Sequence, residues 1–145
     1  MLTTEKVYSI GEVSKITGLP SSTIRYYDSL DFLPYLQKSR QGIRKFTQKD
    51  IDTIRVVECL KQSGLTLKEI QHYTHLVAQG DSSIVDRQQL FHAIRQRLLN
   101  KMNDLQKTLK ILDYKCMYYD QAAKDGTEKN VLESMSLATV INKLK

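Results

Sequence analysis

Apolar residues recur at helical spacing along most of the chain, in segments separated by glycine or proline. Residues 9–18, "SIGEVSKITG", begin with a capping-box spacing from Ser9 to Glu12, repeat apolar residues every three positions and end in a glycine. A second short segment starts near Ser21 and runs to about Asp31. Two short helices joined by a tight glycine-containing turn predict a helix-turn-helix unit.

The second segment has two unlike faces. At 100° per residue, Ile24, Tyr27 and Leu30 lie on one side, which we expect to pack on the first helix. The other side presents small hydroxyl residues and Arg25, with Tyr26 at its edge. Such a surface can approach a nucleic-acid groove closely and bind phosphates or base edges. An amphipathic helix with an incidental arginine is the simpler alternative.

A β-hairpin is predicted in residues 36–46, "LQKSRQGIRKF", because a Gln-Gly turn signal lies between two short stretches that could pair. We expect Phe46 to anchor its base to the core. Five basic residues and no acid fall in the twelve residues 38–49: Lys38, Arg40, Arg44, Lys45 and Lys49. They could neutralise phosphates as a basic wing, or they could form a solvated basic loop.

Two more helices are predicted after the hairpin, capped by Thr47 and Thr66 and each ended by a glycine. His72 and His75 are three residues apart on the second of them, a spacing that can ligate a metal. Because no cysteine or further histidine lies near them in sequence, we expect no metal site there.

A long helix is predicted from about Ile84 to Tyr119, where glycine and proline are absent and apolar residues recur in steps of three and four, with one stutter. Its expected dimerisation seam is Phe91, Ile94, Leu98, Met102, Leu105, Leu109 and Leu112, followed by Cys116 and Tyr119. A small head cannot bury so long a seam, so the helix needs a partner, most simply a second copy. Residues 137–144 predict a short amphipathic tail helix.

Composition adds less than pattern. The 145 residues are 41% hydrophobic and 26% charged, as in an ordinary globular protein, and the formal net charge is +6. Each of the ranges 1–80 and 81–145 holds 11 Lys and Arg against 8 Asp and Glu, so the global charge identifies no partner. No apolar run is long enough for a membrane span, and the N-terminus lacks the apolar core of a signal peptide. With two cysteines and no disulfide framework, we expect a cytoplasmic protein without cofactors.

Three motifs occur together and in order: "YSIGEVSKITGLPSSTIRYYDSLDFLP", "GIRKFTQKDI" and "LKQSGLTLKEI". They resemble the MerR family of bacterial transcription regulators, and the resemblance covers residues 7 to 119. It implies a mainly α fold: a winged helix-turn-helix head with a small β-hairpin wing in residues 1–80 and a dimerisation helix in 81–120. That helix would form an antiparallel coiled coil, and residues 121–145 would form a tail with a short amphipathic helix.

The resemblance also implies how the chain acts. Its second helix would enter the major groove of double-stranded DNA. The implied DNA contacts are Ser22, Thr23, Arg25, Tyr26 and Tyr27 on that helix and Arg40, Arg44 and Lys45 on the wing. A homodimer would bind a pseudo-palindromic promoter operator. By bending and untwisting the DNA, it would let RNA polymerase use both promoter elements.

The effector is the least determined part. Metal-sensing members carry cysteines at the start of the dimerisation helix and in a loop after it, and this chain has none there. The chain is most similar to the small thiol- and aldehyde-responsive branch (NmlR/AdhR-like), whose members carry a cysteine at the position of Cys59. Arg55 lies one turn before Cys59 and would favour a reactive thiolate, although a buried inert cysteine is the common case. Cys116 packs on the coil seam or, with its neighbouring tyrosines, lines an effector pocket.

Other classes of function fit the chain less well. An enzyme with a cysteine nucleophile is disfavoured because no histidine is placed by sequence to activate either thiol. An architectural DNA-binding protein without an effector is the second alternative, and the long dimerisation helix argues against a bare head. A regulator of the same fold that senses a non-covalent small molecule is the third.

Overall fold

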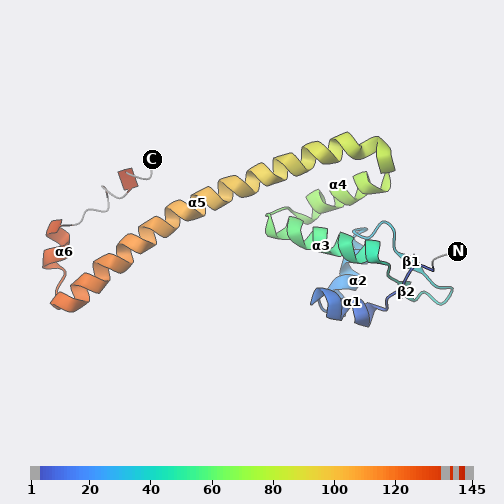
Figure 1. The fold of residues 1–145 in the computed structure, drawn as a ribbon, viewed down its shortest axis with the longest axis horizontal. Coiled ribbons are helices and arrows are strands. Elements are labelled where there is room, and N and C mark those ends of the chain that lie inside the picture. Colours follow the sequence, from blue (N-terminus) through green and yellow to red (C-terminus); the bar gives the residue numbers. More distant parts are fainter. Residues whose placement is uncertain (1–3, 135–137, 139–140, 143–145) are drawn as a thin grey trace. The chain divides into compact units, whose positions relative to one another are not determined.

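The structure is a computed structural model that describes residues 4–134, 138 and 141–142. Its contacts divide the chain into two compact units, Met1–Arg95 and Gln96–Lys145. The first unit holds a helix-turn-helix, a hairpin and two further helices, and α5 (Ile84–Asp125) begins in it (Figure 1). The expected fold class, a mainly helical chain with a winged helix-turn-helix head and a long helix, is confirmed.

The helix-turn-helix consists of α1 (Ile10–Thr17) and α2 (Ser21–Ser29). The capping box of α1 is present, since Ser9 and Glu12 bond reciprocally at 3.2 Å. Gly18 ends α1 at φ 76°, a left-handed conformation that glycine adopts without strain, and this permits the tight turn into α2. The two helices pack through buried residues, Val13 on α1 and Ile24 on α2.

The wing is a two-stranded antiparallel hairpin, β1 (Gln37–Lys38) and β2 (Arg44–Lys45). Its turn is closed by a bond from Ser39 N to Ile43 O at 2.8 Å, with Gly42 at φ 81°. The base of the hairpin is anchored as expected. Phe46 is fully buried and its backbone exchanges hydrogen bonds of 2.7 and 3.1 Å with Tyr8.

The helices α3 (Gln48–Gln62) and α4 (Leu67–Ala78) complete the head, and a 3-10 turn, η1 (Gly80–Ser83), leads into α5. Two apolar clusters hold these elements together. The first joins α1, α2 and the wing base to the start of α3: Val13, Ile24, Leu33, Phe46, Ile51 and Ile54. The second joins α2 to α3, α4 and α5: Tyr27, Phe32, Val57, Leu60, Leu65, Ile70 and Ile94.

The segment that leaves α2 is fixed by α4. The Thr74 hydroxyl donates to the Asp31 carbonyl at 3.0 Å, and the Gln71 amide donates to the Leu30 carbonyl at 3.0 Å. Asp31 itself has φ 60°, which is uncommon for a residue other than glycine and marks a sharp reversal of the chain. The C-terminal end of α2 is therefore held by side chains more than forty residues further along the chain.

The first turns of α5 belong to the head. Leu90 packs against the second cluster, and Ile94 is a member of it with only 6% of its surface exposed. The assignment of Ile94 to the dimerisation seam is therefore wrong, because the head already buries that side chain. For the same reason the first compact unit ends at Arg95 rather than at residue 80, where the head was expected to end.

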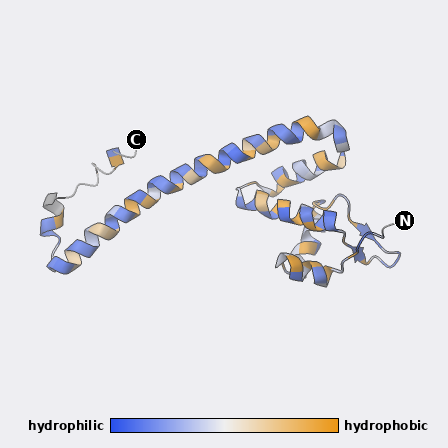
Figure 2. Cartoon of the chain, in the orientation of Figure 1, coloured by the Kyte–Doolittle hydropathy of each residue, from blue (hydrophilic) through white to orange (hydrophobic). Residues whose placement is uncertain are grey.

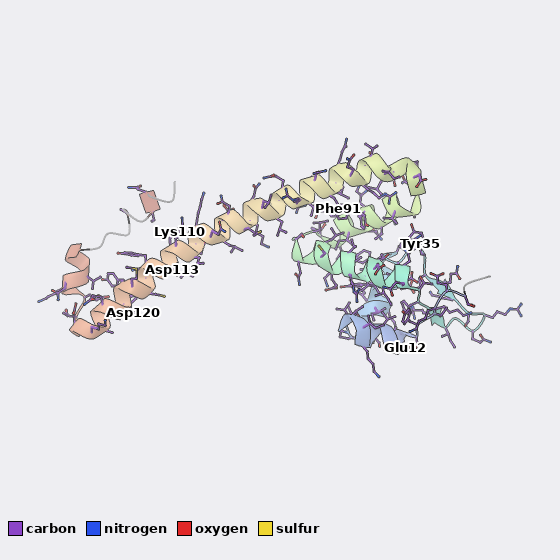
Figure 3. The ribbon with its side chains drawn as sticks, viewed as in Figure 1. Glu12, Tyr35, Phe91, Lys110, Asp113 and Asp120 are labelled. Atoms are coloured by element: carbon purple, nitrogen blue, oxygen red, sulfur yellow. The ribbon has the colours of Figure 1, made fainter. Side chains whose placement is uncertain are left out.

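In the second unit, α5 exposes a long series of apolar side chains that one chain leaves uncovered, and Figure 2 shows apolar and polar positions alternating along the helix. The exposed positions expected in the seam are Leu98, Met102, Leu105, Leu109, Leu112 and Tyr119. Lys110, Asp113 and Asp120 project from the same stretch of helix (Figure 3). A short helix, α6 (Lys129–Ser134), follows α5, and Tyr114, Tyr118, Ala122 and Val131 form a small buried cluster there.

The expected tail helix lies largely outside the described residues. Leu137, Val140 and Leu144 are not described, and Ile141 is exposed. Across the described residues, the helices are too short or too polar to cross a membrane.

Candidate nucleic-acid interface

The outer face of α2 presents the side chains that the sequence singled out. Ser22 and Arg25 are exposed, and half of Tyr26 is accessible, at 50%. Thr23 is half-buried. Because the opposite face of α2 is sealed by Ile24 and Tyr27, the exposed side chains extend from a rigid support.

Tyr27 does not belong to this surface. It is 1% exposed and packs in the second core cluster, with its ring 5.6 Å from that of Phe32. Its hydroxyl donates to the Glu58 carboxylate and accepts from Lys61 Nζ at 2.7 Å, both on α3. The resemblance placed Tyr27 among the DNA contacts, and this expectation needs correction because the side chain faces inward and its hydroxyl is already bonded. The helical period, by contrast, had predicted that Tyr27 lies on the buried face of α2, beside Ile24.

The bonds around Tyr27 shift the proton affinity of two groups. Burial raises the pKa of Tyr27 above its ordinary value of 10.0, and the hydrogen bond to the Glu58 carboxylate raises it further. The hydrogen bond to Tyr27 raises the pKa of Lys61 above its ordinary value of 10.5. Both groups therefore hold their proton more tightly in the folded protein than in the unfolded chain.

The wing adds exposed cations beside α2. Arg40 at the turn and Lys45 on β2 are exposed. Arg44 is half-buried, because its Nε donates to Asp28 Oδ2 at 2.9 Å. Lys38 Nζ lies 3.1 Å from the same oxygen. The wing and the last turn of α2 thus meet at one carboxylate.

Sequence reasoning missed the role of Asp28. It is the only acidic residue of α2, and the basic stretch of residues 38–49 begins ten residues after it. That isolated acid next to a cationic segment was an available signal. The link between Glu58, Lys61 and Tyr27 was also missed, although Glu58 and Lys61 are three residues apart on one helix.

Lys49 belongs to a different environment from the wing. Its ammonium lies 3.7 Å from the centre of the Tyr35 ring, a cation–π contact between the loop after α2 and the first turn of α3; Figure 3 labels Tyr35. This contact gives one of the five basic residues a structural partner other than a carboxylate.

Both cysteines are exposed in the chain. Cys59 lies on α3 directly after Glu58, so it is next in sequence to the residue that bonds Tyr27. Cys116 lies on α5 between the buried Tyr114 and Tyr118. His72 and His75 are also exposed, and within the described part of the chain no group of three or more His, Cys, Asp or Glu side chains could hold a metal ion.

A shallow hollow lies on the first unit between α4 and the start of α5. Its volume is about 270 Å³, and the rings of Tyr73 and Phe91 meet edge to face in its wall, with centroids 5.2 Å apart (Figure 3 labels Phe91). Ile84, Arg87 and Gln88 complete the lining. Burial is the main cause that raises the pKa of Tyr73 above 10.0, so its phenol stays neutral.

Comparisons with known proteins point to one family. A family model described as MerR HTH family regulatory protein matches residues 8–76, and one described as MerR, DNA binding matches residues 51–114. An uncharacterized HTH-type transcriptional regulator of Haemophilus influenzae is 30% identical over 124 residues, which are 86% of this chain and 92% of that protein. The HTH-type transcriptional regulator AdhR of Bacillus subtilis is 32% identical over 91 residues, 63% of this chain and 65% of AdhR.

Solved structures agree with these matches. The crystal structure of HiNmlR, described as a MerR family regulator lacking the sensor domain and bound to promoter DNA, superposes with a TM-score of 0.79. The sequences are 29% identical, and the alignment covers 86% of this chain and 99% of that one.

The bonds of Tyr27 predict an alkaline loss of stability. Tyr27 and Lys61 have raised pKa values in the folded state. What they add to the free energy of unfolding is therefore complete below pH 10 and is lost as the pH rises above it. We expect Tyr27→Phe to lower the free energy of unfolding at pH 7.5 by about 1 kcal/mol. Between pH 7.5 and 10.5 the variant should lose less stability than the wild type, as measured by urea denaturation at both values.

Tyr26→Phe is the matched control, because it removes the same hydroxyl from an exposed neighbour. It should follow the wild type at both pH values. Equal alkaline losses in the wild type and Tyr27→Phe would contradict the assignment of the raised pKa to Tyr27.

Proposed function

Because the chain belongs to the MerR family of helix-turn-helix DNA-binding transcription regulators, we propose that two copies bind a pseudo-palindromic promoter operator and regulate transcription by distorting it. It is a regulator and not an enzyme. In this proposal α2 enters the major groove and the wing contacts the flanking backbone. Bending and untwisting of the operator then let RNA polymerase use promoter elements that are otherwise misaligned.

One observation supports this proposal above the others: the exposed polar face of α2 lies beside a basic wing that one carboxylate joins to it. The proposed contacts on α2 are Ser22, Thr23, Arg25 and Tyr26, and those on the wing are Arg40, Lys45 and the half-buried Arg44. Arginine can bind a guanine edge or a phosphate, and tyrosine and serine hydroxyls can bind phosphate oxygens. The related HiNmlR structure is bound to promoter DNA, which supports the same use of this surface here.

Arg25 gives the sharpest test of DNA binding. Duplexes enriched from a random pool by the wild-type protein would serve as operator candidates. We expect Arg25→Ala to weaken binding to the enriched duplex by about 10- to 100-fold, the loss typical of one arginine contact to a base or phosphate. The measurement is a titration by fluorescence anisotropy at fixed salt, repeated at several salt concentrations.

Lys68→Ala controls for charge, because Lys68 is an exposed cation on α4. It should change the affinity by less than about 3-fold. If the wild type enriches no sequence and binds all duplexes alike, the chain is an architectural DNA-binding protein instead.

Regulators of this family act as dimers. We propose that the exposed apolar series on α5 forms the dimer seam in an antiparallel coiled coil, with Phe91 at its edge. The support is the exposure of Leu98, Met102, Leu105, Leu109 and Leu112 on one face of a helix, which a single chain leaves in water. Two heads joined in this way would match an operator with two half-sites.

Leu109→Glu tests the seam. A charge placed in a buried apolar contact is costly, so we expect the dissociation constant of the dimer to rise by about 100-fold or more. Sedimentation equilibrium measures this directly. Asn103→Glu introduces the same charge on the other side of the helix and should leave the dimer intact. Equal effects of the two changes would exclude the seam.

For the effector, we propose that an electrophile or a thiol stress acts at Cys59. The thiol is exposed, so a reagent can reach it, and it adjoins Glu58, which bonds Tyr27 at the base of α2. Addition of the Cys59 sulfur to an aldehyde carbon breaks the C=O π bond, and the carbonyl oxygen takes up the thiol proton. Exchange with a disulfide breaks its S–S bond and releases one thiol. Either reaction would place a new group beside the contact between α2 and α3. The chain is similar to AdhR over 91 residues, which supports its comparison with the thiol- and aldehyde-responsive branch of the family.

Cys59→Ser tests this sensor. In cells with the wild-type protein, we expect transcription from the promoter of its own gene to rise after an aldehyde or disulfide stress. In cells with Cys59→Ser, transcription should stay unchanged. Cys116→Ser is the control, since Cys116 is also exposed but lies on α5. An adduct mapped to Cys59 by mass spectrometry would support the same conclusion.

A response that survives Cys59→Ser would favour the second candidate, a regulator that senses a non-covalent ligand. The hollow beside Tyr73 and Phe91 is the observation that favours this candidate, because it offers aromatic walls next to a guanidinium. Loss of the response in Cys116→Ser alone would move the sensor to α5.

A further inference from the structure

The charges of the wing conflict with its fold. Lys38 and Arg44 are direct partners across the two strands, and like charges placed opposite each other destabilise an antiparallel pair. The hairpin has only two residue pairs, one residue of each pair on either side of its turn, and a two-stranded hairpin alone is marginally stable in water. Something outside the hairpin must hold these two cations together.

Asp28 supplies that contact. Its Oδ2 accepts from Arg44 Nε at 2.9 Å and lies 3.1 Å from Lys38 Nζ, so one oxygen lies between the two repelling groups. The Asp28 side chain is 17% exposed and that of Arg44 is 26% exposed, whereas that of Lys38 is 48% exposed. The contact with Arg44 is therefore better shielded from water and salt, and we expect it to be the stronger of the two.

We propose that Asp28 is a positioning residue for DNA recognition, which holds the wing against α2 before DNA is bound and keeps Lys38 and Arg44 from binding phosphates indiscriminately. This inference rests on the proposed function, in which α2 and the wing contact DNA. It goes beyond that function because it gives a carboxylate, which repels DNA, a part in choosing the operator.

The physical reason is competition between anions. A phosphate that binds Lys38 or Arg44 on an arbitrary duplex must displace Asp28 or share its cations with it. On the operator, the contacts of α2 fix the register, so the wing meets the backbone already in position and loses less freedom on binding. Asp28 would thus weaken non-specific binding more than operator binding and raise the ratio between them.

The experiment compares Asp28→Asn with the wild type on two duplexes, one enriched by the wild type and one of scrambled sequence. We expect the ratio of the two dissociation constants to fall by about 10-fold in Asp28→Asn. In Asp28→Asn, Lys38 and Arg44 would each be free to bind a phosphate of the scrambled duplex. A plot of the logarithm of the association constant against the logarithm of the salt concentration should then be steeper than for the wild type, by about 1 to 2 in slope. A purely structural defect would weaken both duplexes and leave the slope unchanged.

A second measurement needs no DNA. Hydrogen exchange at the Ser39 and Gly42 amides, which close the wing turn, should become about 10-fold faster in Asp28→Asn, because the repulsion between the strands is no longer offset. If the wild type binds no DNA, the proposed function fails, while this exchange still tests whether Asp28 holds the wing.

Asp52→Asn is the matched control, since Asp52 is an exposed aspartate on α3 whose carboxylate accepts only from Gln48 among the bonds described. It changes the net charge by the same amount. The inference is overturned if Asp28→Asn and Asp52→Asn give the same affinity ratio, salt slope and exchange rates. Should Asp28→Asn fail to fold, Arg44→Gln tests the contact from its other side. It must also lower the ratio of the two dissociation constants, while the affinity for the scrambled duplex depends less steeply on salt. An unchanged ratio overturns the inference.

Discussion

Burial of one face of α2 is the constraint on which the proposed interface depends. The helix has nine residues, too few to be stable alone in water, so its position is set by what it packs against. Ile24 enters one apolar cluster and Tyr27 enters the other, so α2 lies across both. The Tyr27 hydroxyl also bonds two side chains of α3. These directional bonds fix the orientation of α2 on α3 more closely than apolar packing alone would.

The same helix is fixed at its end by polar groups. Side chains of α4 bond the carbonyls of Leu30 and Asp31, and Asp28 bonds the wing. The elements that surround α2 therefore fix its rotation, its end and its relation to the hairpin by separate interactions. A surface that recognises a groove requires such fixed geometry, because an error of about 1 Å in side-chain position is enough to lose contacts.

Local features of the head were predictable from the sequence, and long-range ones were not. The caps of α1 and α4 and the glycine turn of the wing depend on residues within a few positions, and these agree with the structure. The helical period placed Tyr27 inward, while the family resemblance placed it on DNA, and the structure supports the period. Ile94 fitted a heptad as well as any neighbour, because periodicity gives the face of a helix but not what covers that face. Asp28 could not be assigned because its partners lie ten and sixteen residues away.

The burial of Ile94 also defines the smallest part of the chain that can fold by itself. A fragment cut at residue 80, the expected end of the head, would lack Ile94, which belongs to the second cluster, and Leu90, which packs against it. An autonomous head must extend to Arg95 and therefore include the first three turns of α5. The helix that we propose for dimerisation thus begins as a core element, so the head cannot be transplanted to another protein without part of that helix.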